Sequence, residues 1–322
     1  MKRRTLIAAA ATLAQAPLLR PALAQAWPAR TVRIIVPFGA GGPADIYARF
    51  LAERLSGPLG HGFVVENRPG AGAVVGTDAA AKAGADGYTL LMMSNTHTAN
   101  ETLIPNRPYS LMRDFTPVAP VNVANHALVA KTGLATSVAE LIAKAKAAPG
   151  TLNYASSGPG TPYHIAGAAF CYRAGIQVEH IPFRGSGEAR TAIIGGTVDF
   201  MFDSITTQIQ NIEAGRVVGL ATSGPRRNPL LPNLPTVSEA GVAGYTSSIW
   251  LGIMAPAGTP APIVERLNAE ITRVTSAPET VAAWSRQAVE PMRMSPAEFG
   301  AFLQQDIAGQ AEVIRGANIR AS

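Results

Sequence analysis

Short apolar runs alternate with glycine-rich loops and helical patterns along most of the chain. The first run extends from Val32 to Phe38 and is followed by small residues at 39–43. The next stretch carries apolar residues at helical spacing and stops at Gly57 or Gly60; these residues are Ile46, Phe50, Leu51 and Leu55. A repeated order of strand, loop and helix predicts an α/β fold with largely parallel sheets.

Later segments carry helix start signals. Ser137 and Glu140 fit a capping box, and the run from Ser295 to Glu298 opens a last amphipathic helix,. Thr161-Pro162 has the pattern of an N-cap followed by a first helical residue, and Thr259-Pro260 opens a further helix,. These signals predict helices in both halves of the chain.

Three loops between a strand and a helix are rich in small residues, at 39–43, 156–161 and 184–187. They fall at the carboxyl ends of predicted strands, where open α/β sheets place ligands. Helix starts present unpaired N–H groups and partial positive charge, so these loops predict an anion site. Three helix N-termini and Arg184 together provide only a few kcal/mol of binding free energy, whereas micromolar binding needs about 8 kcal/mol. We therefore expect two lobes to close over the ligand and exclude water.

The first 26 residues have the pattern of an export signal. A basic start precedes an apolar stretch at 6–19, and small residues offer cleavage near Ala24 or Ala26,. The stretch is too short and interrupted for a membrane span, and Arg3-Arg4 leaves a twin-arginine export route open. The net charge of +6 falls close to neutral once this leader is removed, so nucleic acid is not an expected partner,.

Motifs of common catalytic and cofactor sites are missing. The sequence holds no G-x-S-x-G, no H-E-x-x-H and no lysine-containing phosphate loop,. The segment from Gly70 to Gly76 resembles a dinucleotide fingerprint, but its last Gly falls one place late and no strand precedes it, which favours a surface turn. The histidines lack metal-ligand spacing, and Cys171 is interpreted as a buried apolar residue,. We predict no metal, no cofactor and no enzymatic activity.

Blocks spread over the mature chain resemble one family. They are Trp27-Pro28, the run at 32–38, Gly41-Gly42, Asp45, and the segments 65–68, 70–72, 86–90, 153–158, 195–199, 234–237, 239–241 and 255–260. In these blocks the chain is similar to the Bug (Bordetella uptake gene) receptors of tripartite tricarboxylate transporters.

The resemblance implies a two-lobed periplasmic binding protein of the Venus flytrap, type II-like class. Each lobe would have a central, mostly parallel sheet flanked by helices, and two segments would cross between the lobes. The signal peptide would be 1–26, the first lobe 27–124 plus 251–322, and the second lobe 125–250. The implied partners are a small carboxylate and integral membrane transporter subunits, and the receptor is expected to be a monomer.

Carried over residue by residue, the family's ligand contacts are made largely through backbone groups and bridging waters. The corresponding residues are Phe38, Ala40, Gly41, Gly42, Asn95, Ser156, Gly158, Thr161, His164, Arg184, Gly185 and Asp203. Phe38 is expected to form an apolar wall, and His164 either touches the ligand or satisfies a local hydrogen bond. These residues fall in the loops that the sequence pattern also indicates.

The loop after Pro182 departs from the family pattern. Many members have an aromatic residue, a basic residue and small residues before another Pro, whereas this chain reaches Glu188. Glu188 could complement a helix dipole or oppose an anion. The roles of Asp45 and Asp203 are also undecided, because each could orient a ligand amine, hold a water or cap local structure.

Three functions remain in competition. The leading interpretation is a receptor that captures a mono- or dicarboxylate, an amino acid or an aromatic acid, for transport or sensing. The alternatives are a nucleotide-dependent or hydrolytic α/β enzyme, using the turn from Gly70 to Gly76 or His164, and a periplasmic scaffold with a vestigial cleft.

Overall fold

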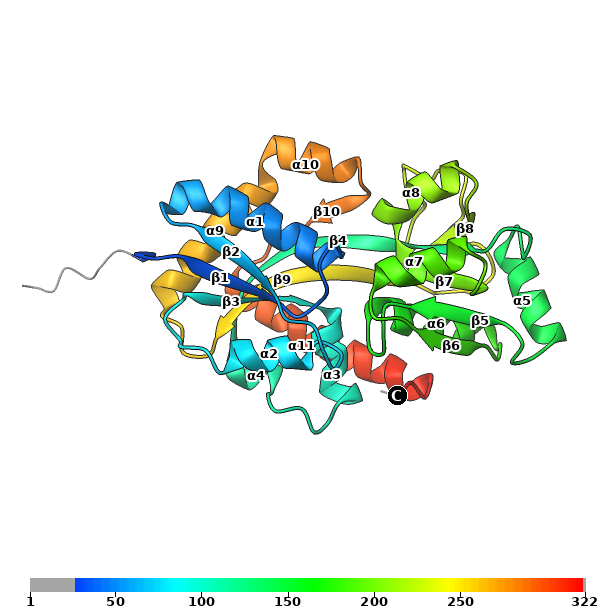
Figure 1. Cartoon of the computed structure of the whole chain (residues 1–322), viewed down its shortest axis with the longest axis horizontal. Coiled ribbons are helices and arrows are strands. Elements are labelled where there is room, and N and C mark those ends of the chain that lie inside the picture. The colour runs from blue at the N-terminus through cyan, green and yellow to red at the C-terminus, as the bar shows by residue number, and fades with distance from the viewer. Residues whose placement is uncertain (1–26, 321–322) are drawn as a thin grey trace, which may run out of the picture.

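The computed structural model describes residues 27–320 as two α/β lobes connected by two long strands (Figure 1). The predicted signal peptide at 1–26 lies outside the described residues. Each lobe is built on one sheet, and the strand β4 (Phe115–Ala130) belongs to both. We call the lobe that contains the start of the described chain the first lobe.

The sheet of the first lobe begins with three parallel strands, β2 (Phe63–Asn67), β1 (Val32–Val36) and β3 (Thr89–Ser94). The strand β9 (Ser248–Pro256) pairs antiparallel with β3 and with β4, and β10 (Val289–Pro291) pairs antiparallel with β4. The inner strands are mostly apolar and buried because helices cover both faces of the sheet,.

The second lobe repeats this design. Its three parallel strands are β6 (Glu179–Pro182), β5 (Asn153–Ser156) and β7 (Phe200–Ser204). The end of β4 pairs antiparallel with β7 and with β8 (Val218–Thr222). The predicted two-lobed α/β class is confirmed, with a parallel part in each sheet and antiparallel pairs at the crossing strands. The residue boundaries given above for the lobes stay predictions.

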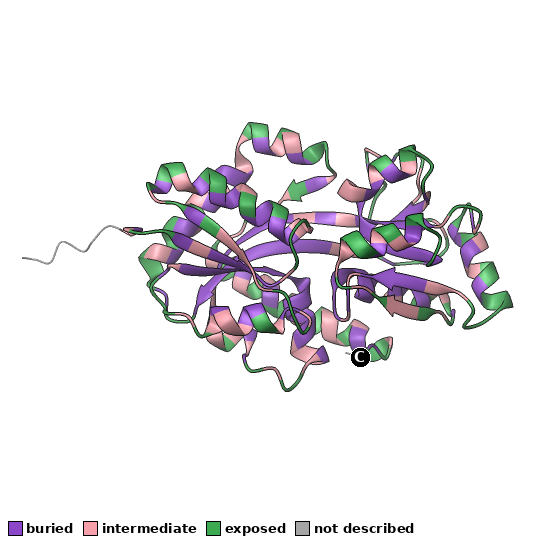
Figure 2. Ribbon diagram, in the orientation of Figure 1, coloured by how far each residue is buried: buried purple, intermediate pink, exposed green. Residues whose placement is uncertain are grey.

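Helices lie on both faces of each sheet (Figure 1). In the first lobe, one face carries α1 (Pro43–Leu59), α9 (Ala261–Ser276) and α10 (Pro278–Ser285). The other carries α2 (Val74–Ala81), α3 (Asn95–Leu103), α4 (Leu111–Asp114) and α11 (Pro296–Gly316). In the second lobe, α5 (Val138–Ala147) and α6 (Pro162–Ala174) oppose α7 (Ser186–Ile194) and α8 (Ile205–Glu213). Figure 2 shows the buried strands between outer helix faces that are exposed.

The buried face of α1 differs from the predicted one. Tyr47, Leu51 and Leu55 are buried at i, i+4 spacing, whereas Ile46 is 47% exposed. The predicted end at Gly60 is correct, because Gly60 has the left-handed conformation that favours glycine,. Ile46 instead lines a cavity between the lobes.

The predicted helix caps are largely confirmed. Ser295 and Glu298 form a complete capping box at the start of α11. Ser137 caps α5 as expected, but the Glu140 carboxylate accepts from the Thr136 amide, one residue earlier than a capping box requires. The turn from Gly70 to Gly76 is confirmed as the entry to α2.

Gly76 allows a close approach between this turn and β1. A Cβ at this position would lie 2.6 Å from the Arg68 carbonyl oxygen and 2.8 Å from Pro37 Cα. Both neighbours are backbone atoms that cannot swing aside, so we expect Gly76→Ala to lower the free energy of unfolding by about 1 to 3 kcal/mol. Gly309→Ala is a matched control, because Gly309 lies inside α11 with open space around it and should gain about 0.5 to 1 kcal/mol,. Chemical denaturation measures both, and equal stabilities would contradict this packing.

The last turn of α11 reaches the second lobe. Ile314 and Ile319 are buried with Leu103 of α3 and Ile165 of α6 in one apolar cluster. The end of α11 and α6 also lie side by side in Figure 1. The lobes are therefore in contact at this edge as well as through β4 and β9. Among residues 27–320, no helix combines the length and apolar character needed to cross a membrane.

Candidate functional site

The loop between β1 and α1 is held by Asp45. The Asp45 carboxylate accepts a hydrogen bond from the Gly41 amide at 2.9 Å and one from Arg49 Nε at 3.0 Å. Burial alone would raise the pKa of Asp45, but the hydrogen bonds from Arg49 and Gly41 lower it below its ordinary value. Asp45 is therefore an ionised residue that shapes the loop, and the Gly41 N–H group is already bonded.

Other predicted residues of the first lobe border this loop. The Phe38 ring meets the His97 ring edge-on at 5.9 Å and is partly exposed. Ala40 and Gly42 are exposed and partly exposed, respectively, and Gly42 is the N-cap residue of α1. Asn95 begins α3, donates from Nδ2 to the Ser248 carbonyl at 2.9 Å, and keeps a buried Oδ1 without a hydrogen-bond partner among the described residues.

The loop between β5 and α6 is closed by its own hydrogen bonds. Ser156 Oγ accepts from the Gly158 amide at 3.1 Å, and Thr161 Oγ1 donates to the Gly158 carbonyl at 2.7 Å. The φ angle of Gly158 is +122°, which a larger residue rarely adopts,. This loop contacts the first lobe, because a Cβ on Gly160 would lie 3.2 Å from Asn100 Oδ1.

His164 holds this loop through a hydrogen bond. Its Nδ1 accepts from the Gly160 amide at 3.0 Å, and its ring stacks on His180 with centroids 4.0 Å apart. His180 Nε2 lies 2.7 Å from Ser156 Oγ, and the Tyr154 ring also stacks with the His180 ring, with centroids 4.9 Å apart. Burial lowers the pKa of His164 to about 3 and that of His180 to about 4, so both rings are neutral near pH 7. Of the two roles expected for His164, the structure displays the local hydrogen bond.

The loop before α7, at 184–187, is partly or fully exposed along its length. The Arg184 side chain is exposed and makes no hydrogen bond or ion pair with the described residues. Its amide donates to Glu188 Oε2 at 3.3 Å, so Glu188 acts here as a cap of the first turn. Gly185 is the N-cap residue of α7, which has no side-chain cap.

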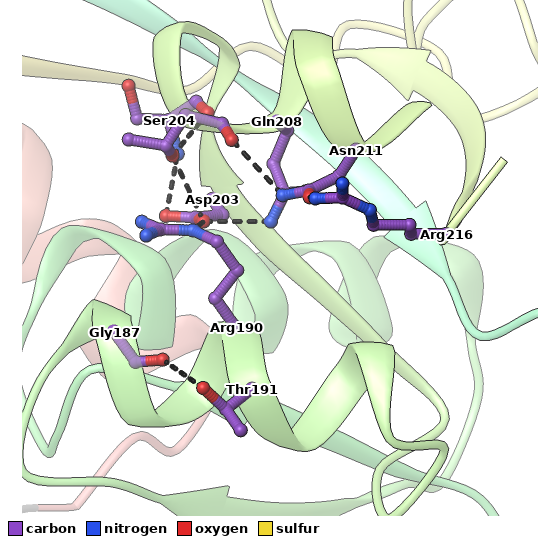
Figure 3. Close-up of polar contacts among 9 residues, drawn as sticks. Gly187, Arg190, Thr191, Asp203, Ser204, Gln208, Asn211 and Arg216 are labelled. Atoms are coloured by element: carbon purple, nitrogen blue, oxygen red, sulfur yellow. Dashed lines mark hydrogen bonds and ion pairs between the residues drawn. The ribbon is translucent and has the colours of Figure 1, made fainter. Parts of the chain in front are cut away.

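Asp203 is fully buried at the end of β7 and accepts four hydrogen bonds (Figure 3). Oδ2 accepts from Arg190 Nε at 3.1 Å, Gln208 Nε2 at 2.8 Å and Thr207 Oγ1 at 3.2 Å. Oδ1 accepts from the Ser204 amide at 2.9 Å. Burial raises the pKa of Asp203, and the Arg190 charge and these donors oppose the rise. The carboxylate anchors the start of α8 and holds the Arg190 side chain.

The two lobes share a cavity of about 40 Å³ beside the crossing strands. Pro43 of α1 and Ser204 at the start of α8 face it from opposite lobes, and Asn122 of β4 forms part of its floor. Neither α1 nor α8 has a side-chain cap. None of the predicted contacts lines this cavity, but Gly42 and Asp203 directly precede two residues that do.

The structure places the predicted residues at the strand ends of both lobes. It also reveals three residues that sequence reasoning missed, Arg190, Tyr163 and His126. Arg190 contacts Asp203, and both residues influence the pKa of Tyr163, which burial raises. The His126 ring meets the Tyr163 ring at 5.1 Å. Arg190 is the middle residue of α7, outside the terminal turns where a charge meets the helix dipole, so the sequence carried no local signal for it,.

Other chemistry receives little support from these residues. Within residues 27–320, no group of three or more His, Cys, Asp or Glu side chains could hold a metal ion. Cys171 is buried, as predicted, and burial raises the pKa of its thiol to about 12. A thiol with this pKa is a poor nucleophile at neutral pH.

Sequence comparison identifies a family. The family described as "Tripartite tricarboxylate transporter family receptor" (TctC) matches residues 47–319. The protein BugT of Bordetella pertussis is 35% identical over 306 residues, which cover 94% of this chain and 94% of BugT.

Solved structures of similar proteins have the same fold. Rpa4515 of R. palustris with adipate is 32% identical with a TM-score of 0.87, covering 91% of this chain and 99% of that one. The periplasmic binding protein BugD is 32% identical with a TM-score of 0.85, at 91% and 99% coverage. MatC from Rhodopseudomonas palustris with bound malate is 30% identical with a TM-score of 0.83, at 89% and 99% coverage.

Proposed function

Because the chain belongs to the TctC family of tripartite tricarboxylate transporter receptors, we propose that this solute-binding protein captures a small carboxylate between its lobes. The observation that carries the proposal is the shared cavity, which the uncapped starts of α1 and α8 face from opposite lobes. Helix starts attract anions through their free N–H groups and dipoles. Adipate and malate, bound by two similar proteins, are carboxylates.

We expect the predicted contacts to act as two groups, one from each lobe, beside this cavity. Backbone near Gly42 and the Asn95 amide would hold the ligand from the first lobe. The loop from Ser156 to Thr161 and Arg184-Gly185 would close on it from the second lobe. Closure excludes water and strengthens each polar contact. This gain in binding free energy is needed because a single helix N-terminus contributes only a modest amount.

The receptor would act in the periplasm, after export directed by residues 1–26, and deliver its ligand to integral membrane transporter subunits. BugD, a protein of the same fold, is a periplasmic binding protein. Binding without turnover is proposed, because neither the buried Cys171 nor the neutral His164 is arranged as an activated nucleophile or base,.

A thermal-shift screen tests this function. Mature protein, freed of co-purified ligand by unfolding and refolding, is expected to melt at higher temperature with at least one acid from a panel of mono- and dicarboxylates, amino acids and aromatic acids. At a hundred times the dissociation constant, a ligand adds about 2.7 kcal/mol to the free energy of unfolding.

Arg184→Ala separates a receptor from a scaffold with a vestigial cleft. Loss of the exposed Arg184 cation should weaken binding of the stabilising acid, whereas Arg173→Ala, on the surface of α6, should leave it unchanged. A panel in which no acid raises the melting temperature would overturn the proposed function.

A further inference from the structure

Asn122 is a buried polar residue of the crossing strand β4, and its amide is not used inside the protein. The residue is 2% exposed, and its Nδ2 has no hydrogen-bond partner among residues 27–320. Asn122 also lines the cavity between the lobes. Buried amides normally have partners, because leaving a hydrogen bond unmade is costly. An unpartnered amide beside a cavity therefore indicates that a bound molecule completes it.

Two threonines that line the same cavity are already hydrogen-bonded within the protein. Thr206 Oγ1 donates to the Gln287 carbonyl at 2.7 Å, and Thr207 Oγ1 donates to the Ser204 carbonyl at 3.0 Å. Asn122 differs from both threonines, because its Nδ2 is enclosed without an acceptor. Asn122 thus offers a ligand a hydrogen-bonding capacity that these hydroxyls have already spent.

The cavity around Asn122 contains no charged side chain. Among residues 27–320, no Asp, Glu, Lys, Arg or His lines it. Burial raises the pKa of Tyr47, another lining residue, to about 12, so its hydroxyl stays protonated at neutral pH. An ammonium group of a ligand would lose water here without meeting an anion, and the starts of α1 and α8 would oppose it. The ligand group beside Asn122 is therefore expected to be neutral.

A hydroxyl is the neutral group that fits the Asn122 amide best. A primary amide has donors at one end and an acceptor at the other, and it presents either end by turning about its last side-chain bond. A hydroxyl both donates and accepts, so it can bond with the amide in either orientation. The cavity of about 40 Å³ admits only about three groups of the size of water,. The hydroxyl would therefore lie on the carbon next to the carboxylate.

We propose that Asn122 is a specificity-determining residue that binds a hydroxyl of the ligand, and that the ligand is a 2-hydroxy acid. The inference rests on the proposed function, because the starts of α1 and α8 would hold the carboxylate beside this hydroxyl. It distinguishes hydroxy acids from the unsubstituted acids and amino acids that share their carbon skeleton.

Trios of acids with one carbon skeleton test the proposal by isothermal titration calorimetry. Each trio contains a 2-hydroxy acid, the acid without the hydroxyl and the corresponding amino acid. Suitable trios are lactate, propionate and alanine; malate, succinate and aspartate; and 3-phenyllactate, 3-phenylpropionate and phenylalanine. In at least one trio we expect the wild-type protein to bind the hydroxy acid about tenfold tighter than either relative, the ratio that one well-formed hydrogen bond provides. This comparison needs no variant.

Two variants locate the preference on the chain. Asn122→Leu keeps a side chain of similar size without its amide, so the hydroxy acid should bind about tenfold more weakly while the unsubstituted acid binds as before. The ligand-free melting temperature of Asn122→Leu should stay equal or rise, because Nδ2 has no internal hydrogen bond to lose,. Asn106→Leu, at an exposed position in the loop after α3, should retain the wild-type preference.

The outcomes separate this inference from the proposed function. Equal affinities within every trio that binds, a preference for an amino acid, or a hydroxyl preference that survives in Asn122→Leu would overturn the role of Asn122 and leave the receptor function standing. A lower melting temperature of ligand-free Asn122→Leu with an unchanged preference would show that the amide is structural. If no acid of the trios or of the wider panel binds, the receptor function itself fails.

Discussion

Lowering the pH from 7 to 5 is expected to destabilise the protein steeply, because four histidines are held neutral inside the fold. Burial lowers the pKa of His97 to about 4, of His126 to about 3, of His164 to about 3 and of His180 to about 4, from 6.5. A folded-state pKa below the unfolded one gives stability that is present above the unfolded value. That stability is lost as the pH falls from about 6.5 towards the folded pKa.

The loss of stability should be large because four histidines contribute to it. Each enclosed histidine loses about 1 to 2 kcal/mol between pH 7 and pH 5, and the partly exposed His180 loses less. The melting temperature should therefore fall by roughly ten degrees. Asp203 and Asp306, whose pKa values burial raises, gain stability only as the pH falls through their folded values, and they oppose the trend weakly in this window.

Thermal melts in a series of buffers between pH 8 and pH 5 measure this loss. His126→Asn keeps a polar side chain without a titrating ring, so its melting temperature should depend on pH less steeply than that of the wild type. Return to pH 7 should restore the original value. A melting temperature that stays flat from pH 7 to pH 5 would contradict the neutral assignment of these rings.

Replacing Asp203 by alanine is expected to lower the free energy of unfolding by about 3 to 5 kcal/mol. The substitution leaves four donors without their acceptor, including the Arg190 cation and the fully buried Gln208 amide,. The start of α8 also loses the bond between Asp203 Oδ1 and the Ser204 amide. Chemical denaturation gives the value directly.

A surface pair provides the comparison. Glu270→Ala breaks the ion pair with Arg273 on the exposed side of α9 and should cost less than about 1 kcal/mol,. Similar losses for the two variants would mean that Asp203 is not the buried anchor of this network.

The loops of the candidate site could be predicted because the sequence signals that define them lie within the loops themselves. Glycine at Gly158 meets a left-handed φ angle, and Thr161-Pro162 marks the start of α6 through the fixed φ of proline,. Neither feature depends on distant residues. The predicted strand ends followed from the same signals.

Features that depend on distant residues were missed. Ile46 looked like a core residue because α1 is apolar at several positions, but the lobes leave a cavity at that point. The long strand β4 contains Pro117 and Pro120, which normally interrupt a strand, and its pairing with β9 shifts register beside both,. The role of Arg190 depends on its contact with Asp203, which lies thirteen positions later in the chain.

The carboxyl-terminal helix has a practical consequence for anyone who handles this protein. Because Ile314 and Ile319 pack with Ile165 of the opposite lobe, a bulky fusion after the last residue would sit beside this contact between the lobes. The described chain begins at the far side of the first lobe (Figure 1), so a purification handle belongs near Trp27. A small fluorescent dye on Tyr172→Cys, whose native ring lies 3.7 Å from the place that a Cβ on Gly316 would take, would report a change at this contact.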